Sequence, residues 1–105
     1  MTHYDSGADF EREVKADLEA RGYYAVRAAG SHGKVDVLAY HMGIALFIQC
    51  KKGGVFPKEE RLSLVHVAKE HNAVPVLAQR IRGDSIWYHR LLSDGVRESF
   101  EPPRL

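Results

Sequence analysis

The chain has 105 residues, of which 45% are hydrophobic and 28% charged, as in an ordinary globular domain. The net charge of +1 excludes nucleic-acid binding through bulk charge alone. The single cysteine excludes an internal disulfide and a Cys-rich zinc site. No stretch resembles a membrane span or a secretion signal, so we expect one cytoplasmic domain over residues 1–105 with no membrane partner.

The first predicted element is a helix over residues 8–21. Ser6 is placed to cap its N-terminus, and Asp9 follows three residues later, a spacing like that of a capping box. Gly22 is a plausible C-terminal cap. One apolar stripe recurs at four-residue intervals along the helix. It consists of Phe10, Val14 and Leu18.

The rest of the chain alternates strand and helix patterns around glycine-rich and proline-rich breaks. The predicted elements are strands at 23–29, 35–41 and 44–52, a helix at 58–71, and strands at 73–81 and 85–92. The segment 98–105 is expected to be irregular because it contains two adjacent prolines. This order of one helix, three strands, one helix and two strands predicts an α/β fold with a central mixed sheet flanked by helices.

The two strands at 35–52 carry polar residues where packing would favour apolar ones. A two-residue turn at Met42-Gly43 sets Asp36 directly across from Gln49. Opposed side chains have Cβ atoms roughly 4.5–5.5 Å apart on one face of a sheet. Lys51 lies two residues beyond Gln49 and shares its face. The turn therefore predicts that these three polar side chains gather in one patch.

A carboxylate, an amide and an amine in one place suit metal-dependent phosphodiester hydrolysis. Mg²⁺ prefers hard oxygen ligands. The bound ion polarises the phosphate and lowers the pKa of a coordinated water. A neighbouring ammonium group orients that water or stabilises the developing charge. The simpler alternative is that these side chains are ordinary solvated residues near the strand ends.

The motifs resemble a known nuclease family. Asp36 followed by Gln49-Cys50-Lys51 resembles the core motif of the PD-(D/E)xK nuclease superfamily. The stretch "GADFEREVKADLEARGYYAVRAAGSHGKVDVLA" is similar to the N-terminal half of archaeal-type Holliday junction resolvases, in which an ERE helix, a VRxAGS segment and the aspartate strand follow in this order. The motif-bearing match covers residues 6–52, and the later elements fit the family layout more loosely.

The resemblance implies a restriction-endonuclease-like fold and a catalytic set. Glu11, Asp36, Gln49 and the backbone carbonyl of Cys50 would hold Mg²⁺, with Mn²⁺ able to substitute. Lys51 would be the catalytic lysine. Arg12, Arg27 and Ser31 match family positions associated with DNA backbone contact or catalysis. Three further candidate DNA contacts would lie near the proposed site, namely His32, Lys34 and Lys52. The substrate would be a four-way DNA junction, whose two-fold symmetry calls for a homodimer that makes paired symmetric nicks.

Several alternatives stay open on the sequence. The helical wheel places Asp17 as close to the apolar stripe as Glu11, so periodicity does not choose between them. Gln49 stands where the family pattern usually has glutamate. The protein could therefore be another PD-(D/E)xK endonuclease, or a non-catalytic DNA-binding module with a degenerate site. Some apolar side chains could serve either the core or a dimer contact, namely Phe56, Leu62, Leu64 and Trp87.

Overall fold

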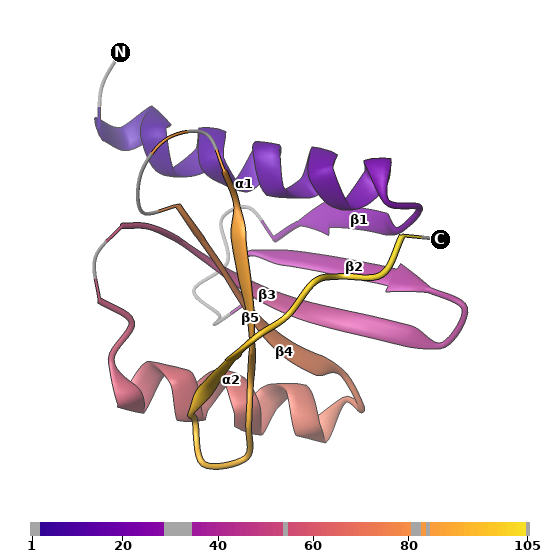
Figure 1. Ribbon diagram of the computed structural model, residues 1–105, viewed down its shortest axis with the longest axis vertical. Coiled ribbons are helices and arrows are strands. Elements are labelled where there is room, and N and C mark those ends of the chain that lie inside the picture. Colours follow the sequence, from indigo (N-terminus) through magenta and orange to yellow (C-terminus); the bar gives the residue numbers. More distant parts are fainter. Residues whose placement is uncertain (1–2, 29–34, 54, 81–82, 84, 105) are drawn as a thin grey trace.

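The structure is a computed structural model that describes residues 3–28, 35–53, 55–80, 83 and 85–104. Two helices lie on opposite faces of one six-stranded sheet (Figure 1). The helices are α1 (His3–Ala20) and α2 (Lys58–Glu70). The strands are β1 (Tyr24–Arg27), β2 (Val37–His41), β3 (Ile44–Lys52), β4 (Val74–Arg80), β5 (Trp87–Leu91) and β6 (Arg97–Ser99), and they lie side by side in that order. Among the described strands, only β3 and β4 pair in parallel, so the predicted mixed sheet is confirmed.

Helix α1 begins earlier than the sequence suggests and ends as expected. It starts at His3, so the prediction that Ser6 caps its N-terminus is wrong, because Ser6 lies inside the helix. At the other end, Gly22 has a φ of 104°. The Gly22 and Tyr23 backbone N–H groups donate to the carbonyls of Glu19 and Leu18, each at 3.0 Å. Glycine accepts this left-handed conformation without a Cβ clash, which closes the helix.

Each face of the sheet has its own core. The stripe predicted on α1 packs over β1, β2 and β3, and the residues buried on this side include Phe10, Val14, Leu18, Val37, Ala39, Leu46, Ile48 and Tyr88. On the other face α2 packs on β3 and β4, and the buried residues are Phe56, Leu64, Leu77 and Leu91. Phe56 and Leu64 therefore belong to the core, whereas Leu62 and Trp87 remain exposed.

The C-terminal segment is more regular than the proline pair suggests. Residues 98–105 were expected to be irregular, but Glu98 and Ser99 belong to β6, which pairs antiparallel with β5. A three-residue strand is too short to show a periodic pattern, and its ladder with β5 is what defines it. After β6 the chain runs back toward the end of α1 (Figure 1). No helix in the described ranges is both long and apolar enough to cross a membrane.

Candidate functional site

The β2–β3 hairpin has the turn and register that the sequence predicts. Met42 and Gly43 both have positive φ, at 43° and 87°. Such a turn connects two antiparallel strands with two residues and matches their twist. The ladder continues to the pair Val37 and Ile48. One residue further on, the backbone N–H of Asp36 donates to the carbonyl of Ile48 at 2.8 Å. Asp36 therefore lies beside the polar end of β3.

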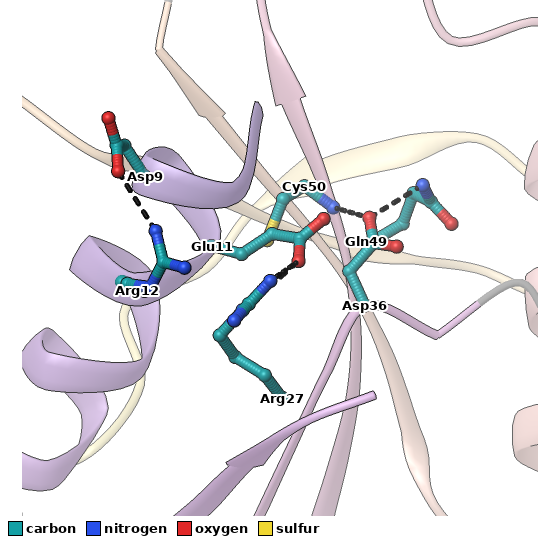
Figure 2. Close-up of polar contacts among 7 residues, drawn as sticks. All are labelled: Asp9, Glu11, Arg12, Arg27, Asp36, Gln49 and Cys50. Atoms are coloured by element: carbon teal, nitrogen blue, oxygen red, sulfur yellow. Dashed lines mark hydrogen bonds and ion pairs between the residues drawn. The ribbon is translucent and has the colours of Figure 1, made fainter. Parts of the chain in front are cut away.

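The carboxylate of Asp36 is held by two donors from β3. Its Oδ2 accepts hydrogen bonds from Nε2 of Gln49 at 2.8 Å and from the backbone N–H of Cys50 at 2.9 Å (Figure 2). The other oxygen, Oδ1, accepts no hydrogen bond from the described part of the chain. The predicted proximity of Asp36 and Gln49 is thus confirmed, with one carboxylate oxygen left for another ligand.

The surroundings of Asp36 disfavour its negative charge. Burial raises the pKa of the Asp36 carboxyl, and the nearby charge of Glu11 raises this pKa further, while the hydrogen bond from Cys50 lowers it. A carboxylate that is desolvated and close to a second carboxylate gains stability when a cation binds between them. These surroundings of Asp36 therefore favour a positively charged ligand.

Helix α1 contributes Glu11 to the surroundings of Asp36. The Glu11 Oε1 accepts from Nε and Nη2 of Arg27 at 3.3 and 3.2 Å, and both side chains are largely buried. Figure 2 shows the Glu11 carboxylate between Arg27 and the Asp36–Cys50 contact. Asp17, the alternative left open by the helical wheel, accepts instead from Arg21 and Tyr88 at 2.9 and 2.7 Å. The structure brings Glu11, and not Asp17, to Asp36.

Lys51 lies on β3 with Gln49, but its side chain contacts residues at and just before the start of α2. Its Nζ is 3.4 Å from Oε1 of Glu60 in α2 and 5.6 Å from the ring centroid of Phe56. Its positive charge still lowers the pKa of Asp36, although burial has the largest effect on that pKa and raises it. The predicted single patch is therefore only partly formed, because Lys51 is directed toward the start of α2.

Cys50 presents its backbone, and not its thiol, to the carboxylate. Its N–H points to Asp36. In an extended strand the N–H and C=O of one residue point to the same side, so the carbonyl is aimed toward β2 as well. Burial raises the pKa of the Cys50 thiol, and the Cys50 side chain packs against the core on the α1 face of the sheet.

The proposed DNA-contacting residues are distributed unevenly. Arg12 forms an exposed ion pair with Asp9 at 2.9 Å, and Lys52 is exposed at the end of β3. Arg27 is turned inward to Glu11. The predicted contacts at Ser31, His32 and Lys34 lie outside the described residues. In the described ranges no group of three or more histidine, cysteine or acidic side chains could by itself hold a metal ion. A site here would depend on amide and backbone oxygens in addition.

Sequence patterns do not single out the residues that surround Lys51. Glu60 falls within a predicted helix, and Phe56 is an apolar residue that suits either the core or a dimer contact. The signal was the pair Glu59-Glu60 at the start of α2, which also suits the positive end of a helix dipole. Sequence alone could not tell that one of the two acids faces Lys51.

The mixed sheet with a helix on each face has the restriction-endonuclease-like fold. Its acid-amide cluster joins Asp36, which directly precedes β2, to Gln49 on β3. A family model described as archaeal Holliday junction resolvase (Hjc) matches residues 2–98. The chain belongs to this family.

Two relatives give the extent of the likeness. The crossover junction endodeoxyribonuclease Hjc of Methanocaldococcus jannaschii is 33% identical over 97 residues, which cover 88% of this chain and 72% of the relative. The solved structure of Hjc from Archaeoglobus fulgidus, a Holliday junction resolvase, matches with a TM-score of 0.69 and 24% identity. That match covers 78% of this chain and 74% of the other, and it supports the fold.

Proposed function

We propose that this protein is a metal-dependent endodeoxyribonuclease that resolves four-way DNA junctions in the cytoplasm by paired symmetric nicks. The observation that carries the proposal is the cluster of Asp36, Glu11 and Gln49, which lies on the fold of a family named for this activity. The printed name of the relative from M. jannaschii, crossover junction endodeoxyribonuclease, supports the same reaction.

The donor atoms of this cluster fit Mg²⁺, with Mn²⁺ as a substitute. Asp36 and Glu11 offer carboxylate oxygens (Figure 2). The carbonyl of Cys50 would lie on the side of its N–H, which donates to Asp36. Gln49 would turn its amide so that Oε1, and not Nε2, faces the ion. All four donors are hard oxygens, which Mg²⁺ prefers. The ion would polarise the scissile phosphate and activate a water molecule.

Lys51 would stabilise the negative charge that develops on the phosphate during cleavage. Arg27 would hold Glu11 in place until the cation arrives, because their ion pair neutralises the carboxylate. Together with Arg12, Ser31, His32, Lys34 and Lys52, Arg27 would also contact the DNA backbone. Each phosphate contact would add about 0.9 to the slope of log affinity against log salt on duplex DNA.

A homodimer would place one site on each of the two strands to be cut. An exposed apolar surface supports this assembly. We define the β1–β2 surface as Tyr24, Val26 and Tyr40, which are 72%, 37% and 48% exposed. Tyr24 pairs directly with Tyr40, so their side chains share the face opposite the α1 core. Because α2 packs on β3 and β4, this face is open to a second copy.

A second candidate function is supported by the contact between Gln49 and Asp36. The Gln49 amide N–H donates a hydrogen bond of 2.8 Å to the Asp36 carboxylate, and this contact needs no metal ion. A site stabilised in this way could persist in a DNA-binding module that no longer cleaves. A third candidate is an endonuclease of the same superfamily that acts on other DNA structures.

The test is a cleavage assay with labelled junction, duplex and single-stranded DNA in Mg²⁺. We expect symmetric nicks in the junction only. We expect Asp36→Asn and Lys51→Ala to lose about 10²-fold or more in cleavage rate while still binding the junction. Junction binding without cleavage in Mg²⁺ or Mn²⁺ would instead identify a non-catalytic module. Equal cutting of duplex DNA would identify a different endonuclease.

A further inference from the structure

The ammonium group of Lys51 is held by residues that lie outside the nuclease motif. We propose that Glu60 is a positioning residue, which fixes the direction of the Lys51 side chain before substrate binds. The inference rests on the proposed function, because it concerns how Lys51 is prepared for cleavage. It assigns a role in the reaction to the first turn of α2, a segment that contributes no residue to the motif.

Two contacts define the position of the ammonium. Lys51 Nζ lies 3.4 Å from Glu60 Oε1 on one side and 5.6 Å from the centroid of the Phe56 ring on another. Phe56 is 2% exposed, and its ring is packed into the core on the α2 face of the sheet. A cation over an aromatic face is attracted by the ring. The Lys51 side chain itself is 31% exposed, so most of its surface is covered by neighbouring residues.

The segment that carries Phe56 is itself anchored. Arg61 donates through Nη1 to the Phe56 carbonyl and through Nε to the carbonyl of Gly95 at 2.8 Å. These bonds tie the start of α2 to the turn before β6. Functional groups are most effective when the residues around them are locked by packing and hydrogen bonds. Glu60 and Phe56 therefore stand on a rigid support.

A structural role explains Glu60 less well. Glu60 is half exposed, and exposed ion pairs contribute little to the stability of a fold. Its neighbour Glu59 also lies in the first turn of α2, where a negative charge interacts favourably with the helix dipole just as that of Glu60 does. Lysine is a point charge on a flexible stem. Restricting it before substrate arrives removes part of the entropy cost of reaching the transition state.

The test compares Glu60→Gln with the matched control Glu59→Gln. Both variants lose one negative charge from the same helical turn. We expect Glu60→Gln to lower the single-turnover cleavage rate of the junction by about threefold to fivefold, with junction affinity unchanged within about twofold. Glu60→Asp keeps the charge on a shorter side chain and is expected to fall between Glu60→Gln and wild type. Glu59→Gln should match wild type in both rate and affinity.

A second measurement does not depend on activity. In metal-free protein, acylation of Lys51 by an amine-reactive ester is followed by peptide mass spectrometry. Loss of the ion pair in Glu60→Gln should speed this labelling by at least about twofold, and Glu59→Gln should leave it unchanged. The proposal is overturned if an active wild-type enzyme and its Glu60→Gln variant cut equally fast, if the variant cuts faster, or if labelling does not change. An inactive wild-type protein would overturn the proposed function itself.

Discussion

At the residue scale, the decisive feature is that Gln49 gives Asp36 a neutral partner. A glutamate at this position would bring a second carboxylate to within hydrogen-bonding distance of the first. The amide avoids that repulsion, and it also removes one negative charge from the group proposed to bind the metal. If the cluster binds a metal ion as proposed, we expect Gln49 to lower the metal affinity while it stabilises the metal-free protein.

We predict that Gln49→Glu lowers the Mg²⁺ concentration needed for half-maximal cleavage by about tenfold. Without metal the same variant should be destabilised by about 1–3 kcal/mol, because the carboxylate of Asp36 loses its amide donor and faces a like charge. Cleavage titrations and thermal unfolding with and without Mg²⁺ measure the two effects. An unchanged metal requirement would remove Gln49 from the proposed ligand set.

At the element scale, the C-terminal segment is attached to α1 and β5 through one buried cation. Arg21 is 7% exposed and donates to Asp17, Glu101 and the carbonyl of Pro102 at 2.8–2.9 Å. Its guanidinium also lies 5.4 Å from the centroid of the Tyr88 ring. This network explains why the segment after β6 has a defined position although it is not a strand.

We predict that Arg21→Ala lowers the free energy of unfolding by about 3 kcal/mol, because Asp17 and a backbone carbonyl lose a buried donor. Glu101 is 75% exposed, so Glu101→Ala should cost less than about 1 kcal/mol. Urea unfolding of the two variants measures the difference. Equal losses would mean that the exposed carboxylate, and not the buried contacts, holds the segment.

At the scale of the whole molecule, the two edges of the sheet differ. The β1–β2 surface exposes paired tyrosines that α2 leaves uncovered. Near the opposite edge, Val96 precedes β6 and is 52% exposed, and Leu92, whose N–H donates to the Val96 carbonyl, is 36% exposed. Both are aliphatic, whereas aromatic side chains such as the paired tyrosines are enriched at protein interfaces. The proposed dimer therefore uses the β1 side.

We predict that Tyr24→Lys shifts the protein from dimer to monomer, because a charge in the centre of the interface is desolvated on association. The variant should nick one strand of the junction but lose paired nicks. Val96→Lys is the matched control and should remain dimeric. Sedimentation velocity gives the oligomeric state. A wild-type monomer would contradict the proposed dimer, and a Tyr24→Lys variant that still dimerises would place the interface elsewhere.

Local sequence patterns determined the buried face of α1 and the register of the β2–β3 hairpin. The spacing of Phe10, Val14 and Leu18 predicted the buried face of α1, because helical periodicity repeats over several turns. The two-residue turn determined the register of β2 and β3, and with it the contact between Asp36 and Gln49, because strand side chains alternate strictly. These features depend on neighbours in the chain.

Only the tertiary structure decided between features that look equivalent along the chain. The helical wheel does not distinguish Glu11 from Asp17. In the structure Glu11 lies near Asp36, whereas Asp17 accepts hydrogen bonds from Arg21 and Tyr88. Strand alternation places Lys51 on the same face of the sheet as Gln49, but its ammonium group forms an ion pair with Glu60 of α2. In both cases the choice depends on residues distant in sequence, whose positions follow from how helices pack on the sheet, and no local pattern encodes that packing.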